Sequence, residues 1–188
     1  MAEIPTESFL KHLSDREGFE SYVYADSLGK LTGGTGHLLT EKELAKYKKG
    51  QKIDETTTKQ WLIDDSSKAY NAAIAQADEA GITDQAFIEA LASVNFQLGT
   101  GWRGKFKGTW NAIKAGDFKL AAEEAMYKDP SELDKGPPSK DRMSSWFQQT
   151  PVRVNDFTAA LKIYGMKKDR ESLKPDDAVI ESIGQIQP

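Results

Sequence analysis

Cysteine is absent from the 188 residues of this sequence, which excludes disulfide bonds and thiolate metal sites. Folding therefore does not depend on an oxidising compartment. Histidine is scarce as well, and two histidines without cysteine do not make a zinc site. We expect neither a metal nor a cofactor.

Long apolar runs are also missing, and no window of the sequence is apolar over the length needed to span a bilayer. The first residues lack the basic segment followed by an apolar stretch that marks a secretory signal. We therefore expect no signal peptide and no membrane insertion. A target outside the cytoplasm would have to be reached by another route.

The sequence has no excess of positive charge. It contains 25 lysines and arginines against 29 aspartates and glutamates, so its formal net charge is -4 and its pI is near 5.3. This balance argues against a dedicated nucleic-acid-binding protein. The length suffices for one substantial core, and we expect one main domain and a monomer.

What the chain does contain is helical periodicity over most of its length. Thr6 predicts the N-cap of a first helix that Glu17 closes, and Asp54 or Thr56 predicts the start of a long helix through Ala77. Further helices are predicted over residues 41–49, 83–98 and 118–127, with a short one around Trp110.

The C-terminal part combines one clear helix with weaker signals. Thr150 before Pro151 predicts a capping hydroxyl followed by a proline at the first helical position, and Gly165 predicts the helix end. We therefore place one domain over residues 1–164 and a tail over residues 165–188, with one weak helix from 175 to 183. The proline- and glycine-rich stretch 129–140 is expected to be an exposed loop.

The region from Tyr22 to His37 gives the one convincing β signal. Its short aromatic and β-branched pieces are broken by Ser27-Leu28-Gly29 and by further glycines, which suits a small antiparallel hairpin sheet. The fold class is therefore α+β and predominantly α-helical. The glycines that follow Thr32 would also suit a phosphate cradle, but no Lys-Ser or Lys-Thr pair follows them, which argues against nucleotide binding.

Three polar residues in and beside this hairpin, Glu17, Asp26 and Thr32, could carry chemistry. Glycoside hydrolysis usually needs one carboxyl that protonates the leaving oxygen and one ionised carboxylate that activates water. Glu17, at a helix end near Phe19 or Tyr22, could be desolvated and keep its proton, whereas Asp26 in a solvated turn would stay charged. Thr32 lies across the hairpin and could hold the water. Taken alone, both acids favour structural roles, because an acid at a helix end and an aspartate in a turn are common and mostly structural.

A combined pattern carries a resemblance to a known family, the phage-type lysozymes of glycoside hydrolase family 24. The resemblance covers roughly residues 7–164. The residues that match in order and spacing are Glu17-Gly18, Tyr24, Asp26, Gly29, Thr32, Gly34, Gly36-His37-Leu38-Leu39-Thr40, Phe96-Gln97-Leu98-Gly99 and Trp146-Phe147-Gln148-Gln149-Thr150-Pro151-Val152-Arg153.

The resemblance implies a peptidoglycan muramidase that inverts the anomeric carbon and cleaves the β-1,4 bond between N-acetylmuramic acid and N-acetylglucosamine. Glu17 would be the general acid, Asp26 the carboxylate that helps water attack, and Thr32 the hydroxyl that positions it. The expected architecture is lysozyme-like, with a small N-terminal β-hairpin lobe and a helical C-terminal lobe joined by a long helix, and with the cleft between the lobes.

By the same resemblance, other residues would line or support the site. Leu38, Phe96 and Thr109 would bind the saccharide, although Phe96 is equally compatible with a core position. Arg153 would face Glu17. His37 is interpreted as a structural residue that is hydrogen-bonded to Asp64 or Asp65 on the long helix, rather than as a catalytic base.

Some features depart from the family's usual pattern or have two interpretations. Gly33 stands where the family usually has a β-branched residue, so we expect a looser hairpin there. The interleaved charges and aromatics from Trp102 to Trp110 suit either contact with the wall or a cover over helix ends. The acidic balance predicts wall binding that is weaker or more tolerant of salt.

Two alternatives stay open at this stage. A non-catalytic wall-binding or scaffold module would keep the fold and lose turnover. A lytic transglycosylase would need only the acid and would form an anhydro product. The place of action is equally open, because the protein could wait in the host cytoplasm for release to the wall or be carried by the virion.

Overall fold

The computed structural model describes residues 3–26, 28–129 and 139–173, and the chain divides into two compact units, residues 1–105 and 106–188. Each unit is described by itself. In unit 1 the elements are α1 (Glu7–Glu17), β1 (Glu20–Ala25), β2 (Leu31–Gly34), β3 (His37–Leu38), α2 (Glu41–Lys46), α3 (Glu55–Glu79), α4 (Gln85–Leu98) and α5 (Trp102–Lys105). In unit 2 they are α6 (Lys107–Lys114), α7 (Phe118–Met126), a 3-10 helix (Lys140–Arg142), α8 (Ser145–Gln149) and α9 (Pro151–Ser172).

Local side-chain caps fix where the helices of unit 1 begin. The Thr6 hydroxyl accepts the Phe9 N–H at the start of α1, and the Asp54 carboxylate accepts the Thr57 N–H at 2.8 Å at the start of α3. These groups satisfy N–H donors that have no partner inside the helix. The sequence predictions at Thr6 and Asp54 are confirmed, and α1 ends at Glu17 as predicted.

The predicted hairpin forms, and a third strand extends it into an antiparallel sheet in the order β1-β2-β3. The backbone of residues 50–53 runs along the free edge of β1, where the Val23 N–H donates to the Gln51 carbonyl and the Ile53 N–H to the Ser21 carbonyl, both at 2.9 Å. A cluster of buried side chains packs with this sheet: Val23, Leu39, Tyr47, Ile53 and Trp61.

Gly33 lets this cluster approach the backbone of β2. A Cβ atom at this position would lie 2.5 Å from the Cδ1 atom of Ile53 and 3.3 Å from the Trp61 ring. These two side chains therefore fill the space that a β-branched residue would otherwise occupy. A looser hairpin at Gly33 stays a prediction, but its position is packed rather than empty.

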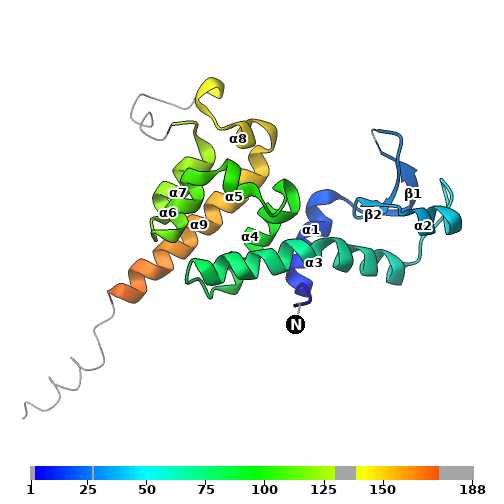
Figure 1. Ribbon diagram of the computed structural model, residues 1–188, viewed down its shortest axis with the longest axis horizontal. Coiled ribbons are helices and arrows are strands. Elements are labelled where there is room, and N and C mark those ends of the chain that lie inside the picture. Colours follow the sequence, from blue (N-terminus) through cyan, green and yellow to red (C-terminus); the bar gives the residue numbers. More distant parts are fainter. Residues whose placement is uncertain (1–2, 27, 130–138, 174–188) are drawn as a thin grey trace, which may run out of the picture. The chain divides into compact units, whose positions relative to one another are not determined.

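The long helix α3 connects the two halves of unit 1, as Figure 1 shows. Near its start it packs against the sheet through Trp61, and further along it contacts α1, where the rings of Phe9 and Tyr70 lie 5.5 Å apart. Its main partner is α4, whose predicted core stripe is confirmed at Phe87 and Leu91.

A buried polar network closes the far end of unit 1. The side-chain amides of Gln76 and Asn95 exchange hydrogen bonds of 2.9 and 3.1 Å, and the Trp102 indole N–H donates to the Gln76 carbonyl oxygen at 3.3 Å. Trp102 is fully buried and Trp110 of unit 2 nearly so. Both tryptophans are core residues, so they do not form the aromatic wall-contact surface that was one interpretation of this stretch.

Unit 2 is helical, and α9 packs along α7 (Figure 1). The predicted stripe of Phe157, Leu161 and Tyr164 is buried. Tyr164 meets the ring of Phe118 edge-on with centroids 4.9 Å apart, and Trp146 of α8 lies 5.7 Å from Phe157. Aromatic contacts thus join α7, α8 and α9.

Two sequence predictions in α9 are wrong. Pro151 stands at the start of α9 as predicted, but the Thr150 hydroxyl makes no capping bond there, because its backbone (φ -139°, ψ 64°) departs from the extended conformation of the caps at Thr6 and Asp54. The hydroxyl donates to the Trp146 carbonyl of α8 at 3.3 Å. Gly165 does not end the helix, which continues to Ser172. A Cβ atom at position 165 would lie 3.1 Å from the Cβ of Phe118, so glycine is explained here by close packing of two helices rather than by a cap.

The helix α9 therefore extends into the segment predicted to be a tail. The weak helix predicted over residues 175–183 and most of the loop predicted over 129–140 lie outside the described residues. The predicted fold class is confirmed, since the chain is α+β and mostly helical with a small N-terminal antiparallel sheet. In the part of the chain that the structure describes, no helix is both long enough and apolar enough to cross a membrane.

Candidate active site

One face of the sheet gathers two of the predicted site residues. Thr32 on β2 is the direct partner of Tyr24 on β1 and of Leu38 on β3. Side chains directly opposite each other in an antiparallel pair point to the same face, so these three lie in one row across the sheet. Thr32 is 5% exposed and Leu38 is 50% exposed. The predicted catalytic hydroxyl thus lies beside an apolar side chain that is open to a ligand.

Asp26 is held in the turn between β1 and β2. Its Oδ1 atom accepts the backbone N–H groups of Leu28 and Lys30, each at 2.8 Å, and the Asp26 N–H donates to the Lys30 carbonyl at 2.8 Å. The Thr32 hydroxyl donates to the same Lys30 carbonyl at 3.3 Å. The main chain of Lys30 therefore ties Asp26 and Thr32 together, as the predicted hairpin requires.

Glu17 is the last residue of α1, and two residues separate it from β1. Gly18 follows as the C-cap, and its N–H donates to the Ser14 carbonyl at 3.2 Å. Glu17 is exposed, so the predicted desolvation by Phe19 or Tyr22 is not found. The reason is geometric: Phe19 lines a groove to which Glu17 does not contribute, and Tyr22 is itself 46% exposed.

The remaining predicted binding residues are divided between the units. Phe96 is half-buried near the end of α4 in unit 1. Thr109 on α6 is 1% exposed, and Arg153 in the first turn of α9 is half-buried, both in unit 2. The predicted meeting of Arg153 with Glu17 and the predicted role of Thr109 in saccharide binding therefore stay predictions.

His37 connects three elements on the opposite face of the sheet, because it pairs with Gly33 in the row next to Thr32 and Leu38. Its Nδ1 atom lies 2.8 Å from Asp65 Oδ2 on α3, and its Nε2 atom lies 3.0 Å from Glu43 Oε2 on α2. The imidazole also stacks on Trp61, with centroids 4.3 Å apart. The predicted hydrogen bond from His37 to the long helix is confirmed at Asp65. Glu43 was not predicted as a partner of His37, although Thr40-x-x-Glu43 is a capping-box pattern that fixes this carboxylate close to His37 in the chain.

The two carboxylates set the charge state of this junction. Burial of the ring opposes the charged form of His37, but the hydrogen bonds and charges of Glu43 and Asp65 outweigh it and raise the pKa of His37. Partial burial opposes the charge of Glu43 as well. Hydrogen bonds from the Thr40 hydroxyl and N–H, together with His37, nevertheless lower the pKa of Glu43 to about 2. The shifts of both pKa values favour the ion pair between His37 and Glu43, which suits a structural role.

Candidate metal ligands do not cluster in the described ranges, where no group of three or more histidine or acidic side chains is arranged to hold an ion. The arrangement on the sheet instead offers a carboxylate and a hydroxyl anchored to one turn, with a second carboxyl at the adjoining helix end. These are the groups used for acid and base chemistry on a bound ligand with the help of water.

Comparisons with known proteins identify the family of the chain. The family model described as phage lysozyme matches residues 14–131, which include Glu17, Asp26 and Thr32. The chain is also similar to a protein named peptidoglycan hydrolase gp36 from Pseudomonas phage phiKMV, with 30% identity over 147 residues. That match covers 78% of this chain but 14% of the phage protein, so the chain corresponds to a small part of that relative's length. With its matched segment extending over more than half of its length, the chain belongs to the phage lysozyme family.

Proposed function

We propose that the chain is a peptidoglycan-degrading N-acetylmuramidase that hydrolyses the β-1,4 bond between N-acetylmuramic acid and N-acetylglucosamine. The observation that carries the proposal is the linkage of Asp26 and Thr32 through the main chain of Lys30, on the sheet face that also carries Leu38. Membership of the phage lysozyme family and the name of the phiKMV relative support peptidoglycan as the substrate.

In the proposed reaction, Glu17 donates a proton to the leaving glycosidic oxygen. A water molecule attacks the anomeric carbon from the opposite side of the ring, and Asp26 accepts a proton from that water. Asp26 Oδ1 accepts two backbone N–H groups, which leaves Oδ2 to face the water. Attack from the side opposite the leaving group inverts the anomeric carbon.

Thr32 would position the water rather than exchange protons. Its hydroxyl hydrogen is directed at the Lys30 carbonyl, so the hydroxyl oxygen can accept a hydrogen bond from the attacking water. Leu38, half exposed in the same row, would contact the apolar face of a sugar. Action at the wall could serve either lysis from the host cytoplasm or wall penetration from the virion, and this proposal is compatible with both.

The test is digestion of purified peptidoglycan by the wild-type chain, by Glu17→Gln and by Asp26→Asn. Released fragments are reduced chemically and identified by mass spectrometry. We expect reducible muramic ends from the wild type and a loss of at least about a hundredfold in both variants. Anhydro ends would instead mean a transglycosylase, and binding without release would mean a wall-binding module. Full activity of Glu17→Gln would refute the proposed mechanism.

A further inference from the structure

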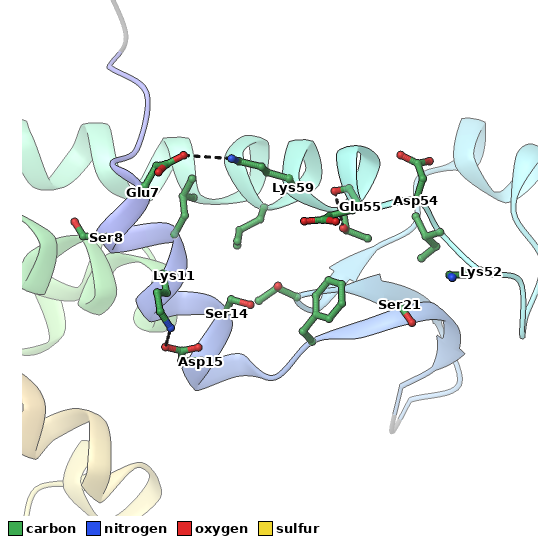
Figure 2. A pocket seen from close by; sticks show the side chains of 16 residues that line it. Glu7, Ser8, Lys11, Ser14, Asp15, Ser21, Lys52, Asp54, Glu55 and Lys59 are labelled. Carbon is green, nitrogen blue, oxygen red and sulfur yellow. Dashed lines mark hydrogen bonds and ion pairs between the residues drawn. The ribbon is translucent and has the colours of Figure 1, made fainter.

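Unit 1 contains a groove between α1, the start of α3 and the segment that leads into β1. Its volume is about 1200 Å³, and Glu17, Asp26 and Thr32 are not among the residues that line it. Figure 2 shows Glu7, Ser8 and Lys11 toward one end and Lys52 and Asp54 toward the other. A groove of this size exceeds the usual range for a small-molecule pocket, roughly 300 to 1,000 Å³, and suits an extended ligand.

The floor of the groove is apolar. It is lined by Leu10 of α1, by Phe19 and Ile53 in the segments before β1 and α3, and by Leu62 of α3. Phe19 is 50% exposed, although a large aromatic side chain gains free energy when it is removed from water. A ligand with alkyl groups would cover this ring and bury its exposed face.

The rim carries both signs of charge, and part of that charge is already neutralised. Lys11 pairs with Asp15 at 2.7 Å, Lys59 pairs with Glu7 at 3.3 Å, and Asp54 is committed to capping α3. A ligand would therefore be bound by charged groups of the groove that have no such partner.

Lys52 and Glu55 are those groups. Within the described segments of the chain, neither side chain takes part in an ion pair or in a hydrogen bond. Both residues are exposed. The groove is therefore lined by one ammonium group and one carboxylate in addition to its apolar side chains.

We propose that this groove binds a short peptide that carries both a free amino group and free carboxylates, the chemistry of the peptides that substitute and cross-link peptidoglycan glycan strands. A ligand carboxylate would pair with Lys52, a ligand ammonium with Glu55, and the alkyl parts of the peptide would cover Phe19. This inference rests on the proposed function, because it assumes that the glycan beside the groove is peptidoglycan.

The position of the groove gives such binding a consequence for catalysis. Asp15 and Phe19, which line the groove, lie two residues on either side of Glu17. A peptide held there would keep its attached glycan strand close to the end of α1. The contact would add affinity for peptide-bearing wall and contribute no group to bond cleavage.

The experiment measures binding of the free peptide Ala-γ-D-Glu-meso-diaminopimelate-D-Ala to the whole chain by NMR titration of backbone amides. We expect shifts for residues of the groove. Lys52→Met and Glu55→Gln should each weaken binding about fivefold, and about twenty-five-fold together if the two contacts are independent. The matched control is Lys49→Met, an exposed lysine on the same segment that does not line the groove, which should bind like the wild type.

A second measurement separates this inference from the proposed function. Wild-type chain is incubated with glycan strands from which the peptides have been removed, and reducing ends are counted. Hydrolysis of these strands without any binding of the free peptide would overturn the groove assignment and leave the proposed function intact. Failure to hydrolyse them or intact wall would overturn the proposed function itself. Equal binding by wild type, Lys52→Met and Glu55→Gln would also refute the groove.

Discussion

Asp26 has a structural role in the β1–β2 turn and a proposed catalytic role, and two substitutions can separate them. Its carboxylate accepts two backbone N–H groups in the β1–β2 turn, and it is also the proposed base. Asp26→Asn keeps an oxygen that can accept both N–H groups, whereas Asp26→Ala keeps none. We expect both variants to lose activity at least about a hundredfold. Only Asp26→Ala should also lose stability, by about 1 kcal/mol, because two backbone donors of this exposed turn exchange the carboxylate for water.

The measurement is urea unfolding of the three proteins alongside the assay for reducing ends. Equal losses of stability in the Asn and Ala variants would show that the turn does not depend on the Oδ1 contacts. Activity in Asp26→Asn close to that of the wild type would show that Asp26 is a turn residue and not the base.

Thr109 carries a buried hydroxyl that costs stability. The residue is 1% exposed, and its Oγ1 atom has no hydrogen-bond partner among the residues that the structure describes. Valine has nearly the same shape without the hydroxyl, so Thr109→Val should stabilise unit 2 by about 1 kcal/mol. Thr158 is the matched control, because its buried hydroxyl donates to the Asn155 carbonyl at 3.1 Å and Thr158→Val should destabilise.

Thermal unfolding of both variants tests this prediction, and the KM for peptidoglycan tests the other role proposed for Thr109. A raised KM together with increased stability would support Thr109 as a saccharide-binding residue. Destabilisation by Thr109→Val would contradict the view that its hydroxyl is unsatisfied.

At the scale of elements, the His37 junction makes the attachment of β3 to α2 and α3 depend on pH. The pKa of His37 is raised, so its contribution to stability is complete below the ordinary value near 6.5 and is lost as pH rises through the raised pKa. The pKa of Glu43 is lowered to about 2, so its contribution is complete above the ordinary value of 4.5 and is lost as pH falls toward about 2. Both contributions are present together between about pH 4.5 and 6.5.

His37→Gln should therefore cost the most near pH 5.5, about 2 kcal/mol, and clearly less once the pH is above the raised pKa of His37. Free energies of unfolding from urea titrations across this range provide the measurement. Glu41→Gln, which removes a carboxylate from the first turn of the same helix α2, serves as the control and should show no such dependence. A cost of His37→Gln that is the same at every pH would mean that the ion pairs contribute nothing and that stacking on Trp61 carries the whole effect.

Element boundaries also show where sequence reasoning succeeds and fails. Thr6 and Asp54 were predictable caps because a cap bonds to an N–H three residues away. Gly165 was misjudged because its role depends on Phe118, which is distant in sequence. The cap at Thr150 was misjudged because this residue also ends the short helix α8, and its backbone there does not take the extended conformation that a capping residue needs.

At the scale of the whole molecule, the net charge of -4 bears on the proposed binding to an anionic wall. An acidic protein gains no long-range attraction to such a polymer, so salt has no favourable interaction to screen. The rate of wall hydrolysis should therefore stay constant or rise as salt increases from about 0.02 to about 0.2 M. Turbidity assays at several salt concentrations provide the test, with a variant in which several exposed acidic residues are replaced by lysine as the comparison. A steep fall in the rate for the wild type would point to a local basic surface that dominates binding.

Much of this protein was determined by its sequence alone. Capping and turn formation depend on residues that are close to one another in the chain. They account for the helix starts at Thr6 and Asp54 and for the β1–β2 hairpin, which follows Glu17 in the chain and contains Asp26 and Thr32. Only the tertiary structure decided which distant groups complete them. It brought Glu43 to His37, continued α9 past Gly165 along Phe118, and turned Phe19 into the groove rather than over Glu17. Packing between segments far apart in sequence sets these contacts, and no local pattern encodes it.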